Sequence, residues 1–441
     1  MDRKDGKRMK LKYGKSEVEI DLSGAKHVEV LTENPMQQIT DIAKEFQACV
    51  EEKVIGSKPL KELITPQDDV TIIISDMTRF WMRQDIICEL LVKYLHDQMG
   101  VDYQKIDVVI ALGSHRKNSA EEREQLASTF VYQHVHQVVD HDCDAETVYV
   151  GTTSFGTEVW VNPLVVGRKV IVISASVHHI MAGYGGGRKS IIPGVASRKT
   201  IRMNHCHALD PQAPKSDSRV GSGKVLDNPI NLDMNEAGRM VHPVFGISVC
   251  VDTASKFSGL FCGDFDAAWK ASCLYIQKSY GLPLEKEADV VFVSCGGFPK
   301  DLNFYQSTKS LFNGVRAMKK GGTIVILAEC NEGSGAKDFF DWIEPLKEGH
   351  LDESLRANFT IGGYIFYAAC EAIAKGRVLL LTSLAPEELQ AMGISCFDST
   401  ETLMKEVDLA GKDVYVIPYG GSVMPQLRED YDRYVAELSG K

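Results

Sequence analysis

The chain lacks an excess of positive charge and lacks any long apolar run. Its 60 acidic residues outnumber its 49 lysines and arginines, which gives a formal net charge of −11. A surface that binds nucleic acid needs a basic footprint to neutralise phosphates, so we expect no nucleic-acid partner. No segment approaches the roughly 18 consecutive apolar residues of a membrane-spanning helix, so we expect no membrane association.

Paired cysteines are missing as well. Eleven cysteines occur singly and never as C-x-x-C, which is typical of free thiols rather than of a disulfide framework or a structural zinc site. The first ten residues, MDRKDGKRMK, are basic, but no apolar segment follows them, so they do not read as a secretory signal. Together these features predict a cytoplasmic protein.

Low-complexity segments and internal repeats are also absent, and hydrophobic residues make up an ordinary 44% of the chain. At 441 residues the chain exceeds the roughly 250–300 residues at which a single core stops growing. We therefore expect two domains.

Short β-branched runs alternate with longer helical stretches along most of the chain. These runs cover residues 70–75, 107–112, 169–175, 289–294, 323–327 and 413–418. Such a rhythm predicts the α/β class, with two α/β domains built on mainly parallel sheets. Near the start, alternating residues on either side of Tyr13-Gly14 instead predict a β-hairpin.

The clearest domain boundary lies in the segment YGLPLEKEA at 280–288, where glycine, proline and charge precede a new strand. We predict an N-terminal cofactor-binding and catalytic domain over 1–282, completed by 415–441. A Rossmann-like α/β domain is predicted over 283–414. Ligands of open α/β sheets bind beyond the carboxyl ends of the strands, so we expect an active-site cleft between the two domains.

A glycine-rich basic segment follows the run at 169–175. Glycines such as Gly186 and Gly187 let a backbone approach a ligand closely, and Arg188 and Lys189 add positive charge suited to a phosphate. The segment is not a Walker A loop, because Arg188 stands where that motif needs glycine. A partly desolvated lysine is also a candidate for covalent attachment. On local evidence a phosphate contact by Lys189 is as good an interpretation, and a plain tight turn is a third.

Polar residues follow two other predicted strands at their carboxyl ends. His115 follows the run at 107–112, and imidazole can act as acid or base near neutral pH. Asp76 and Arg79 follow the run at 70–75. Asp76 can accept from ribose hydroxyls and Arg79 can grip a carboxylate with two hydrogen bonds. The alternative is a helix-capping aspartate with a surface arginine.

The segment His205-Cys206-His207 offers ligands that nickel, copper or zinc accept. Adjacent side chains on a helix point apart, so at most two of the three can share a metal. A buried histidine that only satisfies the core is the alternative interpretation.

Two further groupings carry weaker signals. Gln306 and Lys309 are three residues apart and share a helical face, a pairing that is also common on ordinary surfaces. His134, His136 and His141 are more typical of a strand entering a loop than of a metal cluster.

Taken together, these segments resemble the nickel-dependent lactate racemase family over nearly the whole chain. The most specific stretch runs from His179 through Gly194 to His205. There a histidine, a G-x-x-G-G-x-K loop, a PG turn and an NH pair occur in the family's order. Further matches in family order lie at 76–79, 113–116, 141–142, 299–301, 305–306 and 309.

The resemblance implies a 2-hydroxy-acid racemase or epimerase that inverts C2 by reversible hydride transfer to a nickel-pincer nucleotide. This cofactor is pyridinium-3-thioamide-5-thiocarboxylic acid mononucleotide with nickel. It would be attached covalently through Lys189, with His205 as the nickel ligand. His115 and His179 would be the paired acid/base groups. The other implied contacts are Asp76, Gly186, Gly187, Arg188, Tyr305 and Gln306 to the cofactor and Arg79 and Lys309 to the substrate carboxylate.

The implied partners are a small 2-hydroxy acid and the enzymes that assemble the cofactor. The family commonly continues with proline after Arg79, whereas Phe80-Trp81-Met82-Arg83 follows here. Trp81 could reshape the pocket and Arg83 could meet a second anionic group. Lactate, a malate-like diacid and an aldonic acid therefore all stay open as substrates.

Two other functions are compatible with the same residues. Lys189 could form a Schiff base in a lyase or aldolase that acts on a keto acid. A non-catalytic nucleotide-binding protein would use only the glycine-rich segment, and it would leave His115 and His179 without a role.

Overall fold

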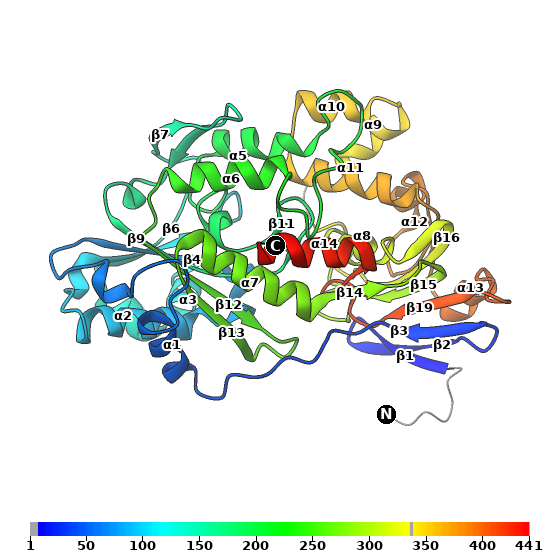
Figure 1. The fold of residues 1–441 in the computed structure, drawn as a ribbon. Coiled ribbons are helices and arrows are strands. Elements are labelled where there is room, and N and C mark those ends of the chain that lie inside the picture. The colour runs from blue at the N-terminus through cyan, green and yellow to red at the C-terminus, as the bar shows by residue number, and fades with distance from the viewer. Residues whose placement is uncertain (1–7, 336–337, 441) are drawn as a thin grey trace. The chain divides into compact units, whose positions relative to one another are not determined.

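The computed structural model describes residues 8–335 and 338–440, and these form two compact units. The N-terminal unit comprises Pro35–Ala208, Ser218–Gln277 and the described part of Val435–Lys441. The C-terminal unit comprises the described parts of Met1–Asn34 and Lys278–Tyr434, together with Leu209–Asp217. Figure 1 shows the helices and strands of both units.

The units differ from the predicted boundaries at both ends of the chain. The segment up to Asn34 belongs to the C-terminal unit, because its strand β3 (His27–Val30) pairs with β19 (Asp413–Ile417). Residues 415–434 also stay in the C-terminal unit, since β19 lies inside its sheet. Such long-range pairing leaves no mark in local periodicity.

The N-terminal unit is built on a six-stranded sheet in the order β13-β12-β9-β4-β5-β6. All neighbours are parallel except the edge pair β12 and β13. β4 and β9 are mostly apolar and, apart from the first residue of β9, buried, as expected for parallel strands with both faces covered. The strands of this unit are β4 (Val70–Ser75), β5 (Ile106–Ala111), β6 (Gln137–Asp140), β7 (Val148–Thr152), β8 (Glu158–Val161), β9 (Lys169–Ala175), β10 (His178–His179), β11 (Gly183–Tyr184), β12 (Phe245–Val251) and β13 (Phe257–Gly263).

Helices flank this sheet, and most begin at a capping side chain that satisfies their free N–H groups. The helices are α1 (Ile42–Glu51), α2 (Gln84–Asp97), α3 (Ala120–Ala127), α4 (Thr129–His134), α5 (Arg198–His205), α6 (Pro229–Arg239) and α7 (Phe265–Tyr280). The 3-10 helices are η1 (Leu60–Glu62), η2 (Met77–Met82), η3 (Tyr103–Lys105), η4 (Pro163–Val165), η5 (Gly187–Ser190) and η6 (Cys206–Ala208). Helices α5 and α6 lie side by side (Figure 1).

The C-terminal unit has a second six-stranded sheet, fully parallel, in the order β18-β17-β16-β15-β19-β3. The predicted hairpin at Tyr13-Gly14 is confirmed as β1 paired with β2. Besides β3 and β19, the strands are β1 (Arg8–Tyr13), β2 (Ser16–Asp21), β14 (Gly281–Leu284), β15 (Ala288–Ser294), β16 (Met318–Leu327), β17 (Arg377–Leu381), β18 (Ile394–Phe397) and β20 (Met424–Leu427). Two α/β units with mainly parallel sheets were predicted, and this fold class is confirmed.

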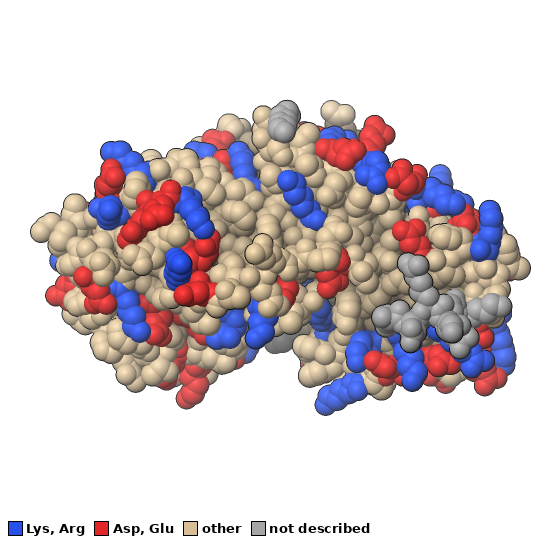
Figure 2. All heavy atoms as spheres, turned by 60° about the horizontal axis from the view of Figure 1, so that its bottom comes forward, with Lys and Arg blue, Asp and Glu red and all other residues tan. Residues whose placement is uncertain are grey.

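The helices of the C-terminal unit are α8 (Phe304–Gly314), α9 (Ile343–Lys347), α10 (Leu351–Ala357), α11 (Ile361–Ile373), α12 (Pro386–Ala391), α13 (Thr400–Lys405), the start of α14 (Arg428–Ser439) and the 3-10 helix η7 (Phe340–Trp342). Within the described ranges, no helix has the length and apolar character that a membrane crossing requires. On the visible part of the face in Figure 2, basic and acidic side chains are interspersed rather than separated into large patches of one sign.

Candidate active site

The strand order of the N-terminal sheet creates a place for a ligand. From the central strand β4 the chain continues to β5 on one side, and it later returns to β9 on the other side. A crevice forms beyond the carboxyl ends of the strands at such a switch point. Asp76 and η2 follow β4, His115 follows β5, and the glycine-rich segment follows β9. The predicted site segments of this unit therefore leave the sheet at one edge.

Asp76 and His115 form a hydrogen-bonded pair at this edge. The Asp76 side chain is nearly buried, and its Oδ2 accepts from Nδ1 of His115, which is itself half-exposed. Burial would raise the pKa of the Asp76 carboxyl, but the hydrogen bond and charge of His115 and the charge of Arg79 outweigh burial and lower it. Asp76 is thus ionised at neutral pH and keeps the His115 proton on Nδ1, which leaves Nε2 as the basic nitrogen.

Arg79 lies within the same turn. Its Nη1 is 3.5 Å from Asp76 Oδ1 and donates to Thr78 Oγ1 at 3.1 Å. Thr78 in turn donates to Asp76 Oδ1 at 2.6 Å. The Arg79 side chain is one-third exposed, at 33%, so the rest of its guanidinium group can still meet an anion.

His179 is held differently from His115. Its Nδ1 accepts hydrogen bonds from the backbone N–H groups of Met181 and Ala182, each at 3.2 Å. A nitrogen that accepts two N–H groups carries no proton, so the neutral His179 ring carries its proton on Nε2. The two predicted acid/base histidines are therefore fixed in opposite tautomers.

Lys189 lies in η5, and its side chain is partly buried. Burial, with smaller contributions from the charges of Arg79 and Arg188, lowers the pKa of Lys189 to about 7. Among the described residues, no carboxylate forms an ion pair with this amine. Lys189 thus supplies a neutral, nucleophilic amine near physiological pH.

Arg188 points the other way, into the protein. Its guanidinium carbon lies 3.4 Å from the centre of the Trp269 ring, and its Nη2 donates to the Ala182 carbonyl at 2.9 Å. Burial lowers the pKa of Arg188 to about 9. Arg188 braces the loop from inside, and its predicted contact with the cofactor stays a prediction.

The glycines of the loop are required by close packing against protein atoms. A Cβ on Gly186 would stand 2.7 Å from the Ala175 carbonyl oxygen, and one on Gly187 would stand 2.7 Å from the Trp269 ring. Both glycines also have positive φ, at 76° and 51°. Their predicted closeness to a ligand stays a prediction, because packing alone accounts for them.

His205 ends α5 and is almost fully buried. Its Nδ1 donates to the Ile201 carbonyl at 2.9 Å, so Nε2 carries the lone pair that a metal binds. Burial, with a smaller contribution from the charge of Lys189, lowers the pKa of His205 to about 3. His205 is therefore neutral at pH 7.

The predicted residues of the second domain lie on α8 of the C-terminal unit. Tyr305 is largely buried, and its ring packs edge-on against Phe339. Lys309 is exposed and donates to Gln306 Oε1 at 2.6 Å. The shared helical face predicted for Gln306 and Lys309 is confirmed, while their roles stay predictions.

Two of three other predicted candidates have partners within the protein. Arg83 pairs with Asp85 through two hydrogen bonds of 3.2 and 3.1 Å, which occupies much of the group expected to meet a second anion. His141 is buried and hydrogen-bonds the Ala196 carbonyl at 2.9 Å, as a core histidine does. Trp81 remains 38% exposed.

Sequence reasoning missed two buried polar residues behind the site. Asn228 caps α6 and donates to the Met181 carbonyl at 2.8 Å. Asp233, on the same helix, accepts from Asn204 Nδ2 at 2.8 Å. Asn204 immediately precedes His205 in the chain. The only available signal was the spacing of Asn228 and Pro229 as a helix start.

Comparison with known families decides the assignment. The model of the lactate racemase N-terminal domain matches residues 13–216, and that of the lactate racemase C-terminal domain matches residues 284–424. The chain belongs to the lactate racemase family. The resemblance predicted from the sequence is confirmed, and with it an isomerase of the racemase type.

Individual relatives agree with this membership. Lactate racemase from Thermoanaerobacterium thermosaccharolyticum is 29% identical over 347 residues, which covers 77% of this chain and 78% of the relative. Lactate racemase from Lactiplantibacillus plantarum is 31% identical over 289 residues, or 65% and 66% of the two chains.

Solved structures support the same fold. The lactate racemase apoprotein from Thermoanaerobacterium thermosaccharolyticum superposes with a TM-score of 0.82 at 26% identity, and covers 95% of this chain and 100% of that chain. A protein from Thermotoga maritima has a TM-score of 0.62 at 17% identity over 90% of this chain and 100% of that chain, and shows the fold alone.

Proposed function

We propose that this protein racemises lactate or a closely related 2-hydroxy acid, with a nickel-pincer nucleotide attached to Lys189. The observation that carries the proposal is the pairing of a neutral, nucleophilic lysine with a buried neutral histidine in a chain of the lactate racemase family. Covalent attachment of the nucleotide needs the nucleophilic lysine. Nickel carried by the attached nucleotide needs the neutral histidine as a ligand.

The residues fit this group. The Lys189 amine, with a pKa of about 7, can form an amide-type bond at neutral pH. The His205 ring presents Nε2 as a metal ligand. In the described part of the chain, no cluster of three or more histidine, cysteine, aspartate or glutamate side chains could hold a metal by itself. A metal at His205 would therefore take its other ligands from the bound group.

When bound, the nickel-pincer nucleotide supplies a reversible acceptor for the hydride of C2. The protein supplies the proton transfers and the orientation of the substrate. Arg79 binds the carboxylate. Nε2 of His115 removes the hydroxyl proton, while Asp76 stabilises the positive charge that develops on the ring.

Inversion needs a second proton carrier for the opposite face of the planar keto acid, and we assign this role to His179. Its Nε2 carries a proton because the backbone occupies Nδ1. A neutral imidazole does not release its remaining proton near pH 7, so proton return from His179 requires the imidazolium form, in which Nδ1 takes up a proton and gives up its two backbone N–H contacts.

The remaining roles stay predictions from the family resemblance. Lys309 would contact the substrate carboxylate, and Tyr305 and Gln306 would support the cofactor. Cytoplasmic location and dependence on cofactor-assembly enzymes are likewise predictions. Because Asp85 already pairs with Arg83, we favour a monocarboxylate such as lactate over a malate-like diacid.

A Schiff-base lysine enzyme is the second candidate, because a Lys189 pKa of about 7 suits imine formation equally well. Borohydride treatment with pyruvate would trap such an imine as a stable adduct of Lys189. Our proposal predicts no adduct of this kind.

The test of the proposed function is a chiral assay of protein produced together with the cofactor-assembly enzymes. Starting from L-lactate in deuterium oxide, we expect D-lactate to form with little deuterium at C2, because the hydride returns directly. Extensive deuterium at C2 would contradict hydride return. Absence of inversion for lactate, malate and short aldonic acids would contradict a racemase.

A further inference from the structure

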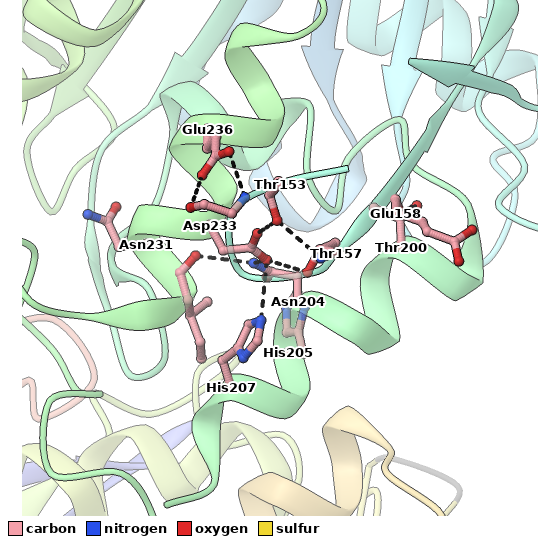
Figure 3. Close-up of polar contacts among 12 residues, drawn as sticks. Thr153, Thr157, Glu158, Thr200, Asn204, His205, His207, Asn231, Asp233 and Glu236 are labelled. Carbon is pink, nitrogen blue, oxygen red and sulfur yellow. Dashed lines mark hydrogen bonds and ion pairs between the residues drawn. The ribbon is translucent and has the colours of Figure 1, made fainter. Parts of the chain in front are cut away.

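Helix α6 carries a buried carboxylate that the proposed function does not use. Asp233 has no exposed surface. Its Oδ1 accepts from Thr153 Oγ1 at 2.6 Å, and its Oδ2 accepts from Thr157 Oγ1 and Asn204 Nδ2, each at 2.8 Å (Figure 3). Burying a charged group is costly unless its partners are well placed, so the position of this carboxylate calls for an explanation.

The two threonines belong to the loop that joins β7 and β8. The backbone N–H of Thr157 donates to Thr153 Oγ1 at 3.1 Å, so the loop presents both hydroxyl groups to Asp233. This part of the network ties the β7–β8 hairpin to α6 and accounts for two of the three hydrogen bonds.

The third hydrogen bond leads to the metal side of the site. Asn204 lies in the last turn of α5, immediately before His205, and is fully buried. Its Nδ2 donates to Asp233 and also to the Ile230 carbonyl at 3.2 Å. Both contacts are on α6, so the end of α5 that presents His205 is anchored there through one side chain.

This anchoring leaves one polar atom unsatisfied. Within the described residues, Asn204 Oδ1 is buried without a hydrogen-bond partner, whereas His207 Nε2 lies 3.7 Å from Asp233 Oδ2 (Figure 3). A buried unpaired polar atom costs about 1–3 kcal/mol. An apolar contact between α5 and α6 would avoid that cost, which suggests that the geometry at His205, rather than stability, requires the amide.

The same helix also supports the His179 loop. Asn228, the N-cap of α6, donates to the Met181 carbonyl at 2.8 Å, and its Oδ1 accepts from the Ile230 N–H at 3.0 Å. The Met181 N–H is one of the two donors to His179 Nδ1. One rigid helix thus contacts the supports of both His179 and His205.

We propose that Asp233 is a positioning residue that acts through Asn204 to hold His205 in the orientation that binds nickel. This proposal rests on the proposed function, in which His205 is the metal ligand. Asp233 does not contact substrate or cofactor in this account. Its effect reaches the metal only through the orientation of the imidazole, as outer-shell residues do at other metal sites.

The experiment is a double-mutant cycle on holo-protein with Asp233→Asn, Asn204→Ala and the two combined. The rate of nickel loss into a chelator is measured by elemental analysis, and nucleotide on Lys189 is measured by intact mass. We expect nickel loss to be roughly 10–100-fold faster for Asn204→Ala and about tenfold faster for Asp233→Asn. The combined variant should lose nickel no faster than Asn204→Ala, because Asp233 acts through that residue.

Glu236→Gln is the matched control. Glu236 lies on the same helix and binds the same hairpin loop, accepting from Ser154 N at 2.7 Å and from Ser154 Oγ at 2.6 Å, but these contacts do not involve α5. It should keep nickel at the rate of the unaltered protein. Unchanged nickel loss in Asp233→Asn, additive effects, or equal loss in the control at a matched Tm would overturn the proposal.

A second measurement uses the apoprotein, so that it remains decisive without cofactor. With 15N-labelled histidine, His205 should give one sharp set of imidazole signals with the proton on Nδ1. Asp233→Asn and Asn204→Ala should shift and broaden those signals and leave those of His115 unchanged. Unaltered His205 signals would refute positioning. If the unaltered holo-protein carries no nickel, the proposed function fails, whereas the apoprotein spectra still test the link between Asp233 and His205.

Discussion

Replacing Asp76 with asparagine isolates the role of the carboxylate behind His115. In the native site, Oδ2 accepts from His115 Nδ1, while Oδ1 accepts from Thr78 at 2.6 Å and lies 3.5 Å from Arg79 Nη1. An amide in the same place must direct its NH₂ group either toward the arginine or toward the histidine. Directing the NH₂ group toward Arg79 would place hydrogen-bond donors against a cation.

The second choice is therefore favoured, and it places N–H donors against His115 Nδ1. The imidazole then moves its proton to Nε2 and loses the basic nitrogen that faces the substrate. Similar loss of the correct tautomer in a histidine–aspartate pair costs about 10⁴ in kcat. We expect Asp76→Asn to lower kcat for lactate racemisation by roughly 10³- to 10⁴-fold, with a much smaller change in KM.

The assay follows both enantiomers of lactate by chiral chromatography, and 15N spectra of the histidines report the tautomer of His115. Asp85→Asn is the control, because Asp85 binds Arg83 in the adjoining segment. A kcat within about threefold of the unaltered protein would refute the reasoning. So would a large loss of activity with the His115 proton still on Nδ1.

Three further predictions concern the pKa of Lys189, the support of the loop and the substrate. Because burial lowers the pKa of Lys189 to about 7, its charged form is disfavoured in the fold. Unfolded protein binds one more proton between pH 7 and about 10, so stability should rise with pH across that window. Lys189→Met should therefore raise the apoprotein's Tm more at pH 6 than at pH 10. An equal change in Tm at pH 6 and pH 10 would contradict the lowered pKa of Lys189. Trp269→Ala removes the ring against Arg188 and the Nε1 donor to the Gly185 carbonyl at 2.8 Å. We expect it to cost about 3–5 kcal/mol in urea unfolding, and a loss below about 1 kcal/mol would show that the loop does not depend on this contact. Arg83→Ala should leave KM for lactate within about twofold, because Asp85 pairs with Arg83; a tenfold rise would place Arg83 at the substrate instead.

The strands and the edge of the sheet that carries the site were predictable from sequence. β-branched runs mark buried parallel strands, and the polar residues that follow them necessarily gather at the carboxyl edge. Asp76 and His115 were each expected at the carboxyl end of a strand, whereas the hydrogen bond between them was not predicted. The pairing of β3 with β19 could not be predicted, because it joins segments nearly 400 residues apart that have no distinctive pattern.

Roles that depend on distant partners were also out of reach. Arg188 looked like a ligand group beside a glycine loop, and only the Trp269 ring explains why it points inward. Asp233 sits in an unremarkable helix, and its meaning comes from Asn204, which is 29 residues away. Local sequence shows the type of a side chain, whereas burial and the identity of its neighbours decide what that side chain does.

The most direct test of the central claim is the intact mass of protein produced with the cofactor-assembly enzymes, combined with peptide mapping. The account predicts a mass increase equal to the bound nucleotide, located on the peptide that contains Lys189 and absent from Lys189→Ala. An unmodified Lys189 in a protein that racemises lactate at full rate would contradict it.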